Sequence, residues 1–154
     1  MNLLPGARWY PSHRADPRAI ALYLRHYSAK RYADGRPRRQ FVSPGEKMVL
    51  LTPEADALWV WHKCKPGLRL DGLEGISCAV FRNESPHLSS DLILEAEALA
   101  WARWPGEPLF TYVDPRRVPT GVPGWCFIRA RWKRVGESKG GLLLEQKQPK
   151  GAKG

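Results

Sequence analysis

The sequence predicts a mixed α/β (α+β) fold, in which a single sheet contains both parallel and antiparallel strands. Three observations predict it. An apolar run at residues 76–81 is stopped by a polar turn, a helical pattern begins near Ser89, and a second apolar run follows at 109–113. Shorter apolar runs on both sides of this unit have the spacing of antiparallel hairpins. We therefore expect antiparallel strands at both edges of the sheet.

The central segment, residues 75–114, is predicted to be one βαβ unit with parallel strands and a right-handed crossover. Ser89 and Ser90 are favoured N-cap residues, and Asp91 adds a negative charge to the first helical turn. Apolar residues then recur at helical spacing until Pro105-Gly106 ends the helix. The turn before the helix should present backbone N–H groups, which suit phosphate or another anion.

The first half of the chain predicts one helix and one hairpin. Asp16 is a good N-cap followed by Pro17, and apolar residues mark a helix to about Tyr27. Residues 28–40 form a loop dense in arginine and glycine. Strands are expected at 47–52 and 58–62, joined by a turn at 53–56 and paired antiparallel. Residues 1–15 are polar and interrupted by proline, and no element is predicted there.

After Asp114 the pattern predicts an extended loop at 115–123 and a short helix at 124–131. Strands at 132–135 and 141–145 should form an antiparallel pair. Residues 1–146 are then a single domain, and residues 147–154, rich in lysine and glycine, are expected to be a disordered basic tail.

Composition excludes several classes of protein. No apolar run approaches the roughly 20 residues that span a bilayer, and the N-terminus lacks the apolar region of a signal peptide. We therefore expect a cytoplasmic protein without a membrane partner. The three cysteines form no CxxC pair and no zinc-finger spacing, so no metal site is expected, and two of them are read as small buried apolar residues.

The net charge of +10 favours an anionic partner, either nucleic acid or a nucleotide cofactor. The alternative is a basic, arginine-rich proteome in which the charge has no specific meaning. Charge placement favours a partner, because basic residues crowd the first quarter of the chain. The predicted nucleic-acid-binding residues are Arg31, Arg36, Arg38 and Arg39, on the loop after the first helix.

The order of elements and one C-terminal motif resemble the GNAT superfamily, the Gcn5-related N-acetyltransferases. The family has a hairpin, a strand feeding a pyrophosphate-binding turn, a long helix and a fifth strand. Residues 124–136, GWCFIRARWKRVG, resemble the family's C-terminal motif, with Arg131-Trp132 where Gly-Phe usually stands. The likeness covers roughly residues 41–145. It implies a GNAT-like mixed sheet with an antiparallel N-terminal hairpin, a central βαβ unit and antiparallel C-terminal strands.

A narrower resemblance is to the Mom-like DNA-modification enzymes of phages, which are themselves GNAT-like. It rests on His26-Tyr27 after the first helix, on Arg82 and Ser90 around the phosphate-side turn, and on Tyr-x-Asp-Pro at the end of a strand, here 112–115. The chain departs from the GNAT pattern in two places. Residues 83–87 contain no glycine, and Phe127 stands where a tyrosine often protonates the departing thiolate.

The resemblance implies a cofactor and a set of residues that hold it. The cofactor is acetyl-CoA or another acyl-CoA, a small-molecule acyl donor. The implied cofactor-binding residues are Cys78 and Val80 on the strand, Arg82 at its end, and Ser89 and Ser90 at the start of the helix. The pantetheine arm should enter where the two central strands separate, just past Phe81.

Four residues are candidate catalytic groups. His26 is the best base by residue type, since its pKa lies near neutrality, or it is a packing histidine at a helix end. Tyr27 and Tyr112 are candidate acids or positioning groups, or core residues. Asp114 could orient a base or hold an amine, or it is only a turn residue.

Two classes of function follow. The first is a GNAT-like acyltransferase whose acceptor is an amine, with a nucleobase in phage-type DNA modification as the favoured acceptor. The second is a non-catalytic, basic nucleic-acid-binding module on a GNAT-like scaffold. Most of the tryptophans are expected in the core, and Trp9 and Trp125 are the ones expected to be exposed for stacking. The oligomeric state is left open.

Overall fold

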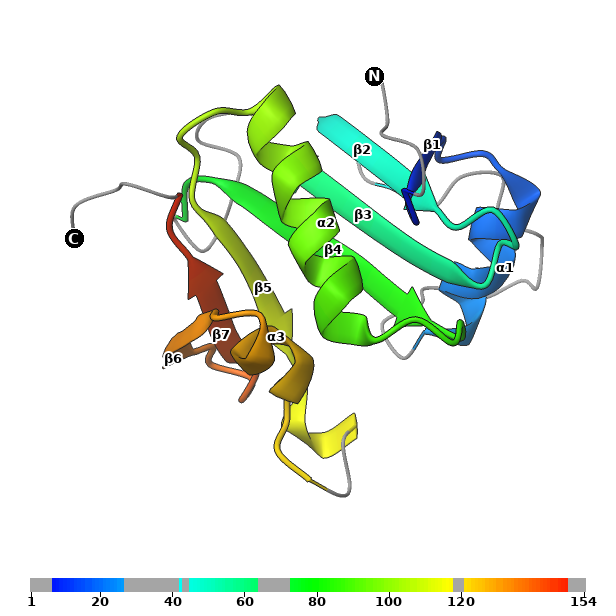
Figure 1. The fold of residues 1–154 in the computed structure, drawn as a ribbon. Helices are drawn as coiled ribbons and strands as arrows, with labels where there is room; N and C mark the ends of the chain where they lie inside the picture. The colour runs from blue at the N-terminus through cyan, green and yellow to red at the C-terminus, as the bar shows by residue number, and fades with distance from the viewer. Residues whose placement is uncertain (1–6, 27–41, 43–44, 64–72, 118–120, 150–154) are drawn as a thin grey trace.

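The protein forms one seven-stranded mixed sheet with helices on both faces (Figure 1). The structure is a computed structural model that describes residues 7–26, 42, 45–63, 73–117 and 121–149. The strand order is β1-β2-β3-β4-β5-β7-β6. In chain order the elements are β1 Tyr10–Ser12, α1 Pro17–Arg25, β2 Glu46–Leu51, β3 Ala57–Lys63, β4 Ile76–Asn83, α2 Ser89–Arg103, β5 Leu109–Val113, the 3₁₀ helix η1 Pro115–Arg117, α3 Trp125–Arg129, β6 Lys133–Glu137 and β7 Leu143–Lys147.

Helix α1 begins where the sequence predicts it. Asp16 is the N-cap, its Oδ1 accepts a hydrogen bond from the Arg18 amide at 2.9 Å, and Pro17 opens the first turn. The helix buries Ala19, Ile20, Leu22 and Tyr23 against one face of β2, β3 and β4, which we call the α1 face. Proline and cap therefore place the helix, and its apolar stripe fixes the face that it covers.

The N-terminal hairpin gains a strand that the sequence does not predict. β2 and β3 pair antiparallel from Glu46↔Lys63 to Leu51↔Leu58, as expected. β1 adds to the outer side of β2, where Pro11 is tolerated because an edge strand needs few of its N–H groups. The expectation that Trp9 is exposed is wrong: its side chain is fully buried, and its indole N–H donates to the Leu92 carbonyl at 2.8 Å.

The central βαβ unit is confirmed, with β4 and β5 parallel and α2 between them. Helix α2 covers the other face of the sheet, which we call the α2 face, and buries Leu92, Ile93, Ala96 and Ala100 there. The predicted cap is wrong. Leu88 occupies the N-cap position without a side-chain bond, and Ser89 and Ser90 lie inside the first turn.

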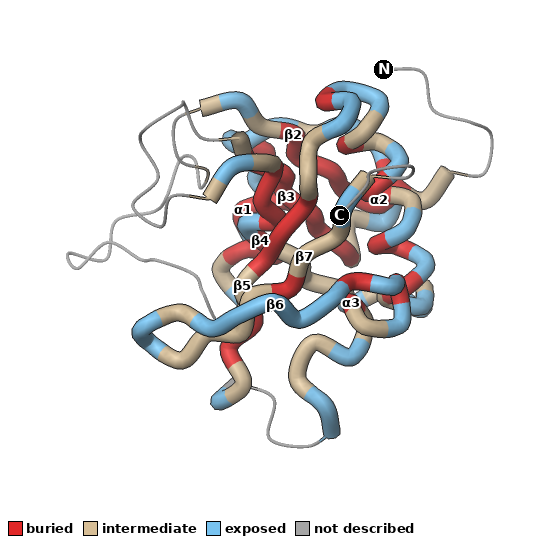
Figure 2. The backbone as a smooth tube through the Cα atoms, turned by 90° about the vertical axis from the view of Figure 1, so that its left-hand side faces the viewer, coloured by how far each residue is buried: buried red, intermediate tan, exposed pale blue. Residues whose placement is uncertain are grey.

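The C-terminal segment closes the sheet with an antiparallel pair. β7 lies between β5 and β6 and pairs antiparallel with both, and the short helix α3 packs on the α2 face. Gln146 and Lys147 belong to β7, so Lys147 is not part of a disordered tail as predicted. Figure 2 shows the buried central strands and β6, which is exposed along its whole length.

The predicted fold class is confirmed. The sheet has an antiparallel hairpin at its N-terminal edge, a central βαβ unit and antiparallel C-terminal strands, in a GNAT-like arrangement. Among the described residues, no helix combines the length and the apolar character needed to cross a membrane.

Candidate functional site

The centre of the candidate site is the place where β4 and β5 stop pairing. Only two residue pairs join these strands, Ile76↔Leu109 and Ser77↔Phe110. Beyond them the strands diverge, as Figure 1 shows. The Thr111 hydroxyl donates to the Cys78 carbonyl at 3.0 Å, so a side chain replaces a ladder bond there. The separation begins after Ser77, earlier than the expected point past Phe81.

A β-bulge lies in β4 next to this separation. Val60 faces Val80 and Trp61 faces Cys78, so Ala79 is an extra residue with no partner in the register. Ala79 is also exposed, between two buried neighbours. A bulge re-aims the residues that follow it and is frequent beside active sites. Cys78 therefore lies on the α2 face and Val80 on the α1 face.

The predicted cofactor residues Cys78 and Val80 thus lie on opposite faces of the strand. Cys78 is buried in the core, and burial raises the pKa of its thiol, so it remains a neutral, small apolar residue. Val80 packs with the apolar residues of α1. The backbone between these two residues, and not their side chains, borders the strand separation.

Asn83 organises the turn between β4 and α2 in place of the missing glycines. Its Oδ1 accepts from the Ser85 amide at 2.9 Å and from the Ser85 hydroxyl. Its Nδ2 donates to the His87 carbonyl and to the Ser89 hydroxyl, both at 2.9 Å. The Asn-x-Ser spacing of an Asx-turn is visible in the sequence, but Asn83 was not singled out there.

The start of α2 retains unsatisfied backbone donors. The amides of Ser85 and His87 are used within the turn, and those of Asp91 and Leu92 donate to the Leu88 carbonyl. The hydrogen bonds of the described residues include no acceptor for the amides of residues 88–90. These three N–H groups lie where the sequence predicts an anion-binding element. Ser90 itself is buried, and Ser89 accepts from Asn83.

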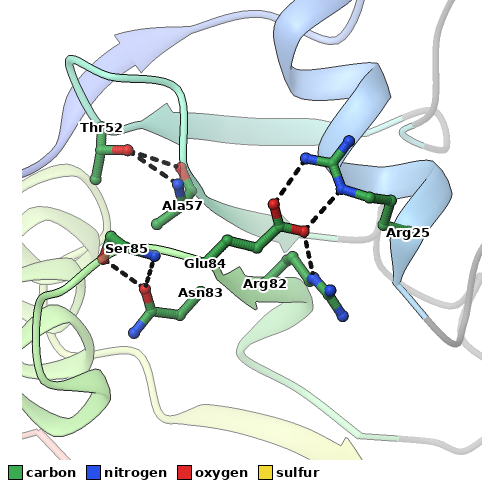
Figure 3. Close-up of polar contacts among 7 residues, drawn as sticks. All are labelled: Arg25, Thr52, Ala57, Arg82, Asn83, Glu84 and Ser85. Carbon is green, nitrogen blue, oxygen red and sulfur yellow. Dashed lines mark hydrogen bonds and ion pairs between the residues drawn. The ribbon is translucent and has the colours of Figure 1, made fainter.

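Arg82 does not point toward these amides. It lies opposite Leu58, a residue of the α1 face, so its side chain projects on that face. There Glu84 accepts from Arg82 Nε at 2.9 Å and from Arg25 Nε and Nη2 at 2.8 Å each (Figure 3). The two guanidinium groups lower the pKa of Glu84 to about 2. Arg82, an implied cofactor-binding residue at the end of the strand, therefore lies on the opposite face of the sheet from α2.

His26 lies in the same region as Arg82. It is the C-cap of α1, and its side chain hydrogen bonds to the backbone of Phe81. Burial, followed by the positive charge of Arg82, lowers its pKa from 6.5 to about 4. The imidazole is consequently neutral at pH 7. The structure thus brings together one predicted base and one predicted cofactor residue at the end of β4.

Tyr112 and Asp114, the other two candidate catalytic residues described by the structure, lie on β5 and directly after it. Leu109 and Val113 belong to the core on the α2 face, so alternation places the half-buried Tyr112 on the α1 face of β5. Asp114 accepts from the Arg116 amide and Nε, both at 3.0 Å, and from Nη2 at 3.3 Å. It opens η1 as a turn residue, which is the structural alternative given above.

Phe127 is buried against Trp59, Phe81 and Trp132 in the core, so it supplies no acid. Tyr27, the second half of the His-Tyr pair, lies outside the described residues. The same holds for the predicted nucleic-acid-binding residues Arg31, Arg36, Arg38 and Arg39. No group of three or more His, Cys, Asp or Glu residues that could hold a metal ion occurs in the described ranges.

The candidate site therefore has two parts. The first is backbone: β4 after Ser77 with its bulge at Ala79, and the amides at the start of α2. The second is the ion-paired group of Arg25, Arg82 and Glu84, with the neutral His26 beside it. Comparison of the chain with protein-family models, with curated proteins and with solved structures finds no match.

Proposed function

We propose that this protein is a GNAT-like N-acyltransferase, which moves an acyl group from a CoA-type thioester to an amine. One observation carries the proposal: two central parallel strands separate after two residue pairs, beside a bulge in one strand and the N-terminus of the connecting helix. The resemblance noted in the sequence places the donor's pantetheine arm in such a separation.

The backbone of the separated strands supports donor binding. An extended chain that carries amides can add to a strand edge through main-chain hydrogen bonds. The donor's pyrophosphate would accept from the amides of residues 88–90, which lie at the positive end of the α2 dipole. Asn83 holds this turn in one conformation, so little ordering is required on binding.

The chemistry requires removal of one amine proton and departure of a thiolate. The amine nitrogen attacks the thioester carbonyl, the C–N bond forms, the C–S bond breaks, and the thiolate leaves with a proton. His26, held at the end of β4, is the proposed acceptor of the amine proton; because its lowered pKa makes it a weak base, it would take the proton after the attacking nitrogen has become positively charged. Tyr112, which lies on the same face of the sheet, is the proposed source of the proton for the thiolate.

The first test is calorimetric titration with acetyl-CoA and with CoA. We expect wild-type protein to bind both, and Ala79→Trp to lose at least tenfold in affinity, because the indole would fill the exposed bulge. Ala98→Trp is the matched control, since Ala98 is an exposed residue on α2 and the same side chain is added there. The proposal would be excluded if neither compound, at millimolar concentration, gave a heat of binding or a change in melting temperature.

A further inference from the structure

We propose that α3 and the start of β6 form a binding surface for single-stranded nucleic acid. The surface, which we call the α3–β6 surface, consists of Trp125 and Arg129 on α3 and of Arg131 directly after it; Lys133 adds a further exposed cation at the start of the edge strand β6. This inference goes beyond acyl transfer and does not rest on it, because none of these residues belongs to the candidate donor site between β4 and β5.

Charge is the first argument. Residues 115–136 include no acidic residue, and the basic ones are Arg116, Arg117, Arg129, Arg131, Lys133 and Arg134. Arg116 is paired with Asp114, and Arg134 with the buried Glu145 at 2.9 Å. Arg129, Arg131 and Lys133 are exposed, and within the described residues they form no ion pair. Their charges are therefore available to a polyanion.

Trp125 is the second argument. All seven tryptophans lie in the described part of the chain, and Trp125 is the exposed one, at 52%. Its separation from Arg129 by four residues places both side chains on the same face of α3. An exposed indole beside a guanidinium group is the arrangement that stacks an unpaired base while the cation holds a phosphate. A duplex offers no such base, so the partner is single-stranded.

Arg131 is the third argument. It has φ +72°, in the left-handed region that favours glycine. It directly follows the end of α3, where the Trp132 amide donates to the Phe127 carbonyl at 2.9 Å and closes the helix. Glycine would adopt this conformation without strain. A strained arginine that makes no ion pair among the described residues is explained if its side chain has a function.

The strain at Arg131 allows a test that separates the stability of the protein from its binding to DNA. Arg131→Gly should leave the melting temperature unchanged or raise it, yet weaken binding to a fluorescent single-stranded DNA of mixed sequence and about 12 nucleotides, a length within the usual site sizes. Loss of one phosphate contact should also reduce the slope of log affinity against log salt by about 0.7. Trp125→Ala should lower affinity about tenfold at constant salt.

Two control variants separate this surface from general effects of charge and strain. Ala55, with φ +57°, is the other described non-glycine residue that has a positive φ. Ala55→Gly relieves the strain at that position without changing the charge of the protein. Arg14→Ala removes an exposed cation near the opposite edge of the sheet. Both should bind DNA like wild type. Arg131→Gly should bind acetyl-CoA with the same affinity as wild type. The nucleic-acid inference and the acyltransferase proposal can therefore fail separately.

Three results would overturn the inference. The first is wild-type affinity in both Trp125→Ala and Arg131→Gly at every salt concentration. The second is an equal loss of affinity in Arg14→Ala, which would indicate a response to net charge alone. The third is binding of the protein to anionic phosphatidylserine vesicles and not to DNA. It would be seen as a fluorescence shift that requires Trp125 and occurs with vesicles but not with the oligonucleotide.

Discussion

His26 shows how one residue takes its chemistry from its surroundings. An isolated histidine is half-charged near pH 6.5, whereas burial and the neighbouring Arg82 hold this one neutral down to about pH 4. The sequence places a histidine at the end of α1, but the charge state follows from contacts with β4. The neutral imidazole has a lone pair that can accept a proton, but the lowered pKa makes it a weak base, and the same shift makes folding depend on pH.

The pH dependence has a defined sign. Between pH 6.5 and about 4 the unfolded chain binds a proton at His26 that the folded chain excludes. Stability should therefore rise with pH through this window and be lost as pH falls from 6.5 toward 4. His26→Gln removes the titration and should flatten the curve there. Urea unfolding of both proteins at several pH values measures the effect, and parallel curves would contradict it.

The turn from β4 to α2 is the element on which the candidate donor site depends. Four hydrogen bonds of Asn83 hold it. A further bond, from the Glu84 amide to the Asp56 carbonyl at 2.7 Å, fastens the turn to the hairpin loop. In the GNAT pattern glycines allow the close approach of pyrophosphate. Here a side chain fixes the backbone of the turn, and the amides of residues 88–90 have no acceptor among the described residues.

Asn83→Ala should destabilise the protein by about 1–3 kcal/mol, because partners at both ends of the side chain lose a bond in a half-buried turn. Donor affinity should fall as well if the turn binds pyrophosphate. Asn83→Asp is the comparison variant: it keeps the acceptor oxygen for Ser85 but replaces the amide donor with a charged oxygen that faces the His87 carbonyl. Thermal unfolding that is unchanged in Asn83→Ala would show that the turn is held by other contacts.

At the scale of the whole molecule, a buried polar cluster joins the C-terminal segment to α2. Glu97 accepts from Lys147 Nζ at 2.6 Å and from the Trp132 indole at 2.8 Å. Lys147 also donates to the Ala130 carbonyl at 2.7 Å. Burial raises the pKa of Glu97, and these partners oppose that shift. The cluster links α2, α3, the entry to β6 and β7 around one carboxylate.

Lys147→Met should cost about 3–5 kcal/mol of unfolding free energy, because it leaves Glu97 buried without its cation. The double variant Glu97→Leu with Lys147→Met should recover a large part of that loss, since neither charge then remains. Denaturant unfolding of the two single variants and the double variant gives the coupling. A double variant no more stable than Lys147→Met would contradict the assignment of the loss to the unpaired carboxylate.

Local signals in the sequence were sufficient for most elements. The Asp16-Pro17 start, the hairpin, the βαβ order and the two C-terminal strands follow from caps, turns and periodicity, because these act over a few residues. The same patterns placed the candidate site at the end of the first central strand. They did not predict β1, which depends on its pairing with β2, or the burial of Trp9, whose partners Leu92 and Glu95 lie more than 80 residues away in the sequence.

The residues of the site were misplaced for one physical reason. If side chains alternated without interruption from Cys78, Val80 and Arg82 would lie on the α2 face, the side on which α2 packs. The bulge at Ala79 adds one residue, and a shift of one residue moves every following side chain to the opposite face. Composition and spacing determined which residues form the end of β4. Only the pairing of β4 with β3 decided that Arg82 lies with His26 and Glu84, and Asn83 with the start of α2.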